Sequence, residues 1–226
     1  MATLFVIGTP IGNLGDISFR AVETLKTVSL VAAEDTRRTL KLLTHFGIRV
    51  TMLSCRSGNE RVAAQKVASV LDSGGSAAYV SDAGTPGLSD PGSVLVRTTA
   101  AAGHTVVPIP GPSAFASLIS VSGATDKTVV FEGFLSPKPG RRRVRVKELL
   151  DARNAFVLYE SPFRIVKLLQ DLAEFDNERY VCVGREMTKL HEEYLRGSIA
   201  EILTILSARR EQMGEFSIFV SGKTRR

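Results

Sequence analysis

The sequence predicts an α/β protein built from two domains. Short apolar segments rich in valine, isoleucine and phenylalanine alternate with segments whose apolar residues recur at helical spacing. Each expected strand ends in a turn rich in glycine, proline, serine or aspartate. The chain has 226 residues, of which 44% are hydrophobic and 23% charged, a length and a composition that suit two folded domains.

The first half alternates strands and helices in a regular order. Strands are expected at 3–8, 30–34, 76–82 and 105–110, and helices at 18–28, 60–74, 92–103 and 113–122. Turn-forming residues cluster at 122–128, so we expect the domains to span residues 1–123 and 124–226. In the second half, strands are expected at 129–135, 155–160, 179–186 and 216–222, with helices between them.

Composition argues against several classes of protein. No apolar run reaches the roughly 18 to 20 residues of a membrane-spanning helix, and the first ten residues lack the basic region and cleavage site of a signal peptide. Cys55 and Cys182 lie far apart without a CxxC pair, which indicates neither a disulfide framework nor a metal site. We therefore expect a cytoplasmic protein with no membrane partner and no bound metal.

Positive charge is concentrated in one segment. The formal net charge is +6, and the stretch KPGRRRVRVK at 138–147 carries six of the cations. Such a field suits a polyanionic partner such as nucleic acid. A solvated loop that runs into a helix with charged sides is the structural alternative.

Four loops that follow expected strands have unusual compositions. They are GTPIGNLGD at 8–16, AEDTRR at 33–38, SDAGTPGLSDPG at 81–92 and PGPSA at 110–114. Open α/β sheets bind ligands at the carboxyl ends of their strands, and glycine permits close backbone approach to a ligand. For any single loop, a tight turn between strand and helix is the simpler interpretation.

The familiar phosphate-binding signatures are absent. Glycines at 8, 12 and 15 do not form GxGxxG, and Ser217 stands at the first glycine position of a near-match to the P-loop. Asp82 and Asp90 would repel phosphate, but they suit a ligand with positive charge or several hydrogen-bond donors. S-adenosylmethionine carries a sulfonium, an ammonium, an amine and ribose hydroxyls without phosphate, so it is compatible with these loops, although the chemistry does not single it out.

An ordered set of motifs then resembles a known family. GTPIGNLGD, AEDTR, SDAGTPGLSDPG, PIPGPSA, FEGFL, YESP and REMTKLHEE follow one another from Gly8 to Gly222. The set is similar to the tetrapyrrole methylase superfamily, and most similar to its RNA-modifying branch. The resemblance implies two α/β domains with S-adenosyl-L-methionine in the cleft between them, and a homodimer. It also implies 2'-O-methylation of a cytidine in the decoding region of 16S rRNA, with the RNA or the small ribosomal subunit as partner.

The resemblance assigns cofactor-binding roles position by position. The matching residues are Pro10, Asp82, Ala83, Gly84, Thr85, Ser113, Ala114, Tyr159 and Met187. Phe163 stands where relatives often have a histidine, so a catalytic histidine is not expected here.

Two polar groups of residues remain for catalysis and RNA binding. Glu34 and Asp35 are candidate bases or positioning groups, or, as the structural alternative, residues of a helix N-terminus that Asp35 caps. The candidates for contacts with RNA phosphate are Arg37, Arg38, Lys138, Arg141, Arg142, Arg143 and Arg145. Tyr159 and Phe163 are expected either to stack on a base or to pack in the core.

Two other functions stay open at this stage. The fold also serves methyltransferases of small tetrapyrrole-like substrates, and the basic run does not exclude them. A non-enzymatic RNA-binding protein is the second alternative, against which stoichiometric binding of S-adenosylmethionine would count. The sequence leaves open the exact nucleotide, the general base, the dimer interface and any requirement for an earlier methylation or an assembled subunit.

Overall fold

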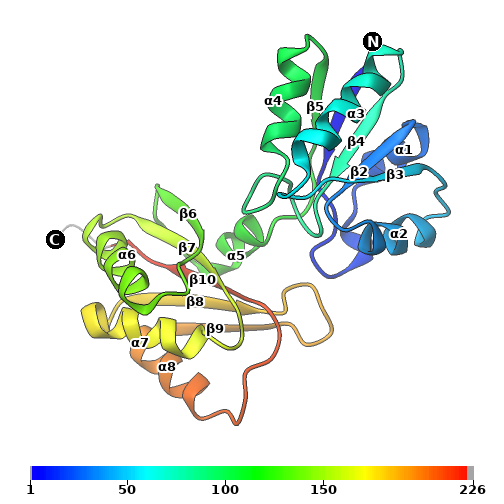
Figure 1. The fold of residues 1–226 in the computed structure, drawn as a ribbon. Helices are drawn as coiled ribbons and strands as arrows, with labels where there is room; N and C mark the ends of the chain where they lie inside the picture. The colour runs from blue at the N-terminus through cyan, green and yellow to red at the C-terminus, as the bar shows by residue number, and fades with distance from the viewer. Residues whose placement is uncertain (1, 223–226) are drawn as a thin grey trace. The chain divides into compact units, whose positions relative to one another are not determined.

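The computed structural model describes residues 2–222, which fold into two compact units (Figure 1). The first unit ends at Ser113 and the second begins at Ala114. The sequence placed this division at 123/124, ten residues later. The difference arises because helix α5 (Ala114–Ser122) packs against strands β8 (Tyr180–Arg185) and β10 (Phe216–Val220) of the second unit.

The first unit contains a parallel five-stranded sheet in the order β3-β2-β4-β1-β5. Every pairing in this sheet is parallel, so the carboxyl ends of all its strands meet at one edge. The strands are β1 (Thr3–Ile7), β2 (Leu30–Ala33), β3 (Thr51–Ser54), β4 (Ala77–Val80) and β5 (Thr105–Ile109).

Helices cover both faces of this sheet. Along β4, Ala77 and Tyr79 pack in the cluster that includes α3 (Glu60–Asp72) and α4 (Ser93–Ala101). The alternate residues Ala78 and Val80 pack in the cluster with α1 (Phe19–Thr27) and α2 (Thr36–His45). Strands buried on both faces read as continuous apolar runs, which explains why they were visible in the sequence.

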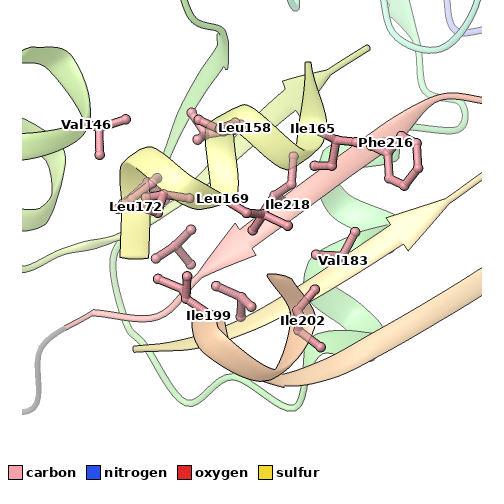
Figure 2. Packing of buried hydrophobic residues seen from close by; sticks show 14 of the residues in the cluster. Val146, Leu158, Ile165, Leu169, Leu172, Val183, Ile199, Ile202, Phe216 and Ile218 are labelled. Atoms are coloured by element: carbon pink, nitrogen blue, oxygen red, sulfur yellow. The ribbon is translucent and has the colours of Figure 1, made fainter. Parts of the chain in front are cut away.

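The second unit contains a mixed sheet in the order β6-β7-β10-β8-β9. Strand β6 (Val129–Phe134) is parallel to β7 (Ala155–Glu160), and the other neighbours are antiparallel, including β8 and β9 (Glu193–Ser198). The helices α6 (Pro139–Asp151), α7 (Ile165–Asp176) and α8 (Ile199–Ser207) contribute to one core cluster with β7, β8 and β10. Figure 2 shows this packing, for example Ile202 and Leu169 with the buried Ile218.

The expected strands and helices are confirmed within a few residues at each end. Strands β3 and β9 were not predicted from the sequence, and helix α2 was foreseen only as the structural alternative for Glu34 and Asp35. Strand β3 lies at the edge of its sheet and has no fully buried residue, so its pattern is weak. Cys55 and Cys182 are buried and unbonded to each other. Within residues 2–222, no helix has the length and apolar character needed to cross a membrane.

Candidate active site

The four loops singled out in the sequence follow β1, β2, β4 and β5 at the carboxyl edge of the first sheet. Direct hydrogen bonds join them. The backbone of Thr9 pairs with that of Gly84 in both directions, at 2.9 and 3.0 Å, and the Thr85 hydroxyl donates to the Pro112 carbonyl at 3.1 Å. The first, third and fourth loops are thus joined to one another directly.

Two glycines allow the first and last of these loops to touch. A Cβ on Gly111 would lie 2.6 Å from the Gly8 oxygen, and a Cβ on Gly8 would lie 2.8 Å from the Gly111 Cα. Neither position has room for a side chain, because the obstructing atoms are backbone. The glycines are therefore required by the close contact between loops.

The long loop at 81–92 is held by residues that the sequence analysis missed. Glu60, buried at the start of α3, accepts hydrogen bonds from the backbone N–H groups of Gly92, Val94 and Leu95 at 2.9, 2.6 and 3.2 Å. Its carboxylate therefore caps the N-terminus of α4, where negative charge is favoured. The hydroxyl of Tyr79 donates to the Pro91 carbonyl at 2.7 Å. The acidic residue after Asn59 was the one available signal, and its distant target could not be read from the sequence.

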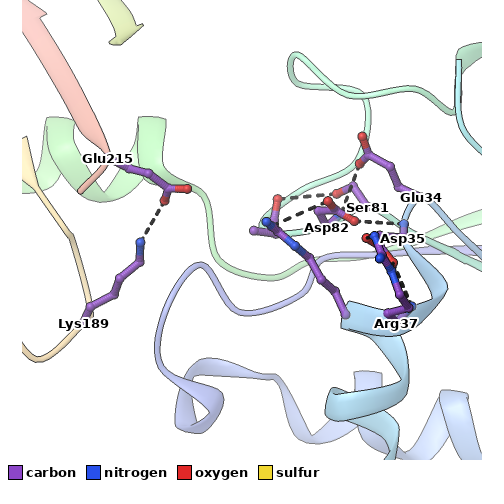
Figure 3. Close-up of polar contacts among 9 residues, drawn as sticks. Glu34, Asp35, Arg37, Ser81, Asp82, Lys189 and Glu215 are labelled. Carbon is purple, nitrogen blue, oxygen red and sulfur yellow. Dashed lines mark hydrogen bonds and ion pairs between the residues drawn. The ribbon is translucent and has the colours of Figure 1, made fainter. Parts of the chain in front are cut away.

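Two carboxylates, those of Glu34 and Asp82, link the second and third loops (Figure 3). Glu34 Oε2 accepts from the Asp82 N–H at 3.1 Å, and Asp82 Oδ1 accepts from the Asp35 N–H at 2.9 Å. Arg38 Nη1 lies 3.6 Å from Asp82 Oδ2. The first two contacts are reciprocal, so they fix the register between the ends of β2 and β4.

The carboxylates of this edge differ in proton affinity. Burial raises the pKa of Glu34, and the neighbouring charge of Asp82 adds to this against the opposing hydrogen bond from the Asp82 N–H. Burial also raises the pKa of Asp90 to about 6, against an opposing hydrogen bond with Ser81. Hydrogen bonds from Arg37 lower the pKa of Asp35 to about 2. Glu34 is therefore a better proton acceptor than Asp35.

Asp35 has the structural role that the sequence offered as an alternative. Its side chain caps α2 by accepting from the Arg37 N–H at 2.8 Å, and it pairs with the Arg37 guanidinium at 2.8 Å. The side chains of Arg37 and Arg38 are 89% and 64% exposed, so both are accessible to a partner.

The donor and acceptor chemistry of this edge fits S-adenosylmethionine. Backbone carbonyls and the carboxylates of Glu34, Asp82 and Asp90 are acceptors, which suits a ligand that carries a sulfonium, an ammonium and hydroxyl donors. The hydroxyl of Thr9, a residue that is only 3% exposed, has no hydrogen-bond partner among the described residues. Buried polar atoms normally have a hydrogen-bond partner. An unpartnered hydroxyl next to Pro10 is therefore what we expect of a loop that binds a polar ligand.

The remaining expected cofactor residues lie in the second unit. Tyr159 is on β7, where its ring meets Phe131 and Phe134 edge to face with centroids 5.1 and 5.7 Å apart. Met187 is buried, and its Sδ packs where a Cβ on Gly184 would otherwise lie. Ala114 begins α5. Close to Met187 in the chain, Lys189 pairs with Glu186 at 2.7 Å. It also pairs with Glu215 at 2.9 Å (Figure 3).

The structure divides the basic run of 138–147 into paired and unpaired cations. Arg142 is only 5% exposed, and its guanidinium pairs with Asp171 at 2.6 Å, so the expectation that it contacts RNA is wrong. Arg143 pairs with Glu174, Arg145 pairs with Glu132 at 2.7 Å and with Glu148 at 2.9 Å, and Lys147 pairs with Asp151 at 2.6 Å. Among the described residues, no carboxylate pairs with the side chains of Lys138 or Arg141, and both residues are exposed.

Comparison with known proteins identifies similar chains. The family model described as Tetrapyrrole (Corrin/Porphyrin) Methylases matches residues 3–203. The Ribosomal RNA small subunit methyltransferase I of Borrelia garinii is 46% identical over 219 residues, which cover 96% of this chain and 98% of the relative. The protein of the same name from Xylella fastidiosa is 46% identical over 97% of this chain and 81% of its own length. A crystal structure of uroporphyrin-III-C-methyltransferase from Thermus thermophilus superposes with a TM-score of 0.65 at 14% identity, covering 98% of this chain and 94% of that one.

Proposed function

The chain belongs to the tetrapyrrole methylase family, whose cofactor is S-adenosyl-L-methionine, and from this premise we propose that it methylates the RNA of the small ribosomal subunit. The observation that carries the proposal is the near-complete alignment with relatives named for that activity, at 46% identity. The acceptor-rich edge of the first sheet supports the choice of cofactor. We further propose, from the resemblance of the motifs, that the acceptor is the 2'-hydroxyl of a cytidine in the decoding region.

The residues proposed to hold the cofactor form two sets. In the first unit they are Pro10, Asp82, Ala83, Gly84, Thr85 and Ser113, on loops that hydrogen bonds join at one sheet edge. Roles for Ala114, Tyr159 and Met187 of the second unit stay predictions. The bound cofactor supplies an electrophilic methyl group, and the rigid loops of this chain orient it, since alignment of reacting atoms provides much of the catalysis in a displacement.

Glu34 is proposed to accept the proton of the ribose hydroxyl. Its pKa is raised by burial, which moves it toward the range in which a carboxylate is an effective base at neutral pH. Asp35 is proposed as a positioning residue, because its low pKa and its hydrogen bonds to Arg37 leave little basicity. Arg37 and Arg38 are proposed to contact phosphate beside this acid.

The proposed reaction is tested with radiolabelled S-adenosyl-L-methionine and small ribosomal subunits that lack their native methylations. We expect label on one cytidine ribose of the decoding region, located by nuclease digestion and mass spectrometry. Naked 16S rRNA in parallel tells whether the assembled subunit is needed. Label on neither RNA, with the cofactor bound, would contradict the proposal and point to a small acceptor such as a tetrapyrrole. Sedimentation of the same preparation tests the homodimer, which stays a prediction.

The assignment of the base is tested by a matched pair of variants. Glu34→Gln keeps an oxygen that accepts from Asp82 but removes the basic carboxylate. We expect methyl transfer to fall about a hundredfold, within the usual contribution of a general base, with the cofactor Kd little changed. Asp35→Asn retains a good helix cap and should lower the rate less. Equal rates for Glu34→Gln and the wild type would remove Glu34 from the mechanism.

A further inference from the structure

Two phenylalanines of the second unit are exposed at the end of its parallel strand pair. Phe134, the last residue of β6, is 61% exposed, and Phe163, in the turn after β7, is 89% exposed. Burial of aromatic rings is strongly favourable, so two exposed rings in one place call for a partner. Core packing, the alternative that the sequence left for Phe163, does not occur.

The same hydrogen-bond network holds the segments that carry both rings. Arg164 donates to the Leu135 carbonyl at 2.8 Å and to Glu160 Oε2 at 2.8 Å. Glu160 is 2% exposed, and its other oxygen accepts from the Ser161 N–H at 2.8 Å. Phe134 and Phe163 are the direct chain neighbours of the two residues that this contact joins, Leu135 and Arg164. The network therefore holds the segment after β6 against the turn after β7.

Phe134 also packs at one end of a chain of aromatic rings. Tyr159 meets it edge to face with centroids 5.7 Å apart, Phe131 meets Tyr159 at 5.1 Å, and Phe115 meets Phe131 at 5.3 Å. These contacts restrict the rotation of Phe134 before any ligand binds. A preorganised ring loses less conformational entropy on binding than a free one.

The unpaired cations of the basic run follow directly in the chain. Lys138 stands at the residue before the first turn of α6, and Arg141 lies in that turn, so they follow Phe134 by four and seven residues. The cations further along the helix are neutralised by carboxylates of the same unit, as with Arg143 and Glu174. Within the basic run, the cations without a carboxylate partner among the described residues are therefore Lys138 and Arg141, at the N-terminal end of α6 and a few residues after Phe134 in the chain.

We infer that Phe134 and Phe163, together with Lys138 and Arg141, form a binding surface for an unpaired stretch of RNA, with the rings stacking on bases and the cations contacting phosphates. The inference rests on the proposed function. It adds two details: which residues hold the substrate RNA, and that they select a single strand. Exposed aromatic rings with adjacent cations are the means by which proteins bind single strands, since bases in a duplex are stacked on one another and unavailable. A duplex offers phosphates to Lys138 and Arg141 but no base face to the rings.

The test measures the Kd of the full chain for a 16S-derived oligonucleotide, single-stranded or annealed to its complement, over a range of salt concentrations. Phe163→Ala should weaken binding of the single strand about tenfold with an unchanged salt slope, because stacking is uncharged. Arg141→Ala should weaken binding and reduce the slope by about 0.7, the value for one phosphate contact on a single strand. A 2-aminopurine placed in the oligonucleotide should lose fluorescence on binding to the wild type and regain it with Phe163→Ala.

Two control variants match the chemistry of these changes. Leu190→Ala removes another exposed apolar side chain of the second unit, which is 93% exposed, and Arg143→Ala removes an exposed arginine of α6 that is already paired. Both should bind RNA as the wild type does. If Phe163→Ala binds as tightly as Leu190→Ala, the inference is wrong. A change in oligomeric state with unchanged RNA affinity would overturn it in favour of a contact with a second copy.

The outcomes separate this inference from the proposed function. Methylation of ribosomal subunits by the wild type, together with unaltered RNA binding by Phe163→Ala, would retain the function and overturn the surface. Loss of single-strand binding by Phe163→Ala would support the surface even if no label reached ribosomal RNA. Binding of the cofactor should be unchanged in Phe163→Ala, which would show that its fold is intact.

Discussion

Removal of Glu60 tests whether one buried carboxylate holds the long loop at 81–92. Glu60→Ala leaves three backbone donors without their acceptor, of which those of Gly92 and Leu95 are buried. An unsatisfied buried donor costs about 1–3 kcal/mol, and the more accessible N–H of Val94 can turn to water, so we expect a loss of about 3 kcal/mol in unfolding free energy. Glu60→Gln keeps an acceptor oxygen without charge and should cost about 1 kcal/mol.

Urea unfolding followed by circular dichroism measures these losses, and hydrogen exchange of peptides from 86–100 locates them. Glu23→Ala is the control, because Glu23 forms only an exposed ion pair with Lys26 and should change stability by less than about 0.5 kcal/mol. The cofactor Kd should rise more for Glu60→Ala than for Glu60→Gln, since the loop is proposed to bind the cofactor. Equal stability of the alanine and glutamine variants, with unchanged exchange near Gly92, would refute the reasoning.

Three other changes have clear expected outcomes. Gly111→Ala would place a Cβ 2.6 Å from backbone of the first loop and should destabilise the protein by about 2 kcal/mol, whereas Gly140→Ala, with nothing within 4 Å, should not; thermal unfolding compares them. Arg142→Ala leaves the carboxylate of Asp171 with 13% side-chain exposure and no partner, so unfolding in urea should show a loss of about 3–5 kcal/mol that Arg142→Met with Asp171→Leu largely restores. The pKa of Asp90, about 6 in the folded protein, lies above its usual value, so its contribution to stability is complete below about pH 4 and is lost as the pH rises through 6. Asp90→Asn should therefore gain about 1 kcal/mol relative to the wild type between pH 4 and 7.5, after allowance for partial exposure, and equal pH profiles of stability would contradict this.

The fold was largely predictable because most strands are buried on both faces. Such strands form continuous apolar runs between glycine-rich turns, and β4 is an example with all four residues buried. The bounds of helix α2 were not predicted, because its polar start, Asp35 to Arg38, was interpreted first as a binding loop and only alternatively as a helix N-terminus capped by Asp35. The domain boundary was displaced because α5 follows the first sheet in the chain but packs on the second, and tertiary packing leaves no local signal.

The positions of the site loops were also predictable, since the carboxyl ends of parallel strands share one edge. The proton affinities of the site residues were not. Glu34 and Asp35 are adjacent in the chain, yet burial raises the pKa of one and Arg37 lowers the pKa of the other. These effects depend on which groups the fold places beside each carboxylate, so two identical functional groups in sequence acquire different chemistry.

The basic run shows the same dependence on partners that lie far away in the chain. Its cations look alike in the sequence, but Arg142 and Arg143 meet acids of α7 that lie 29 and 31 residues further along the chain. An ion pair already formed lowers the gain from a phosphate contact, because the acid must first be displaced and solvated. Net charge over a segment therefore overestimates the surface available to RNA, and the count of unpaired cations is the better guide. That count selects Lys138 and Arg141, which are the cations of the run nearest to Phe134 in the chain.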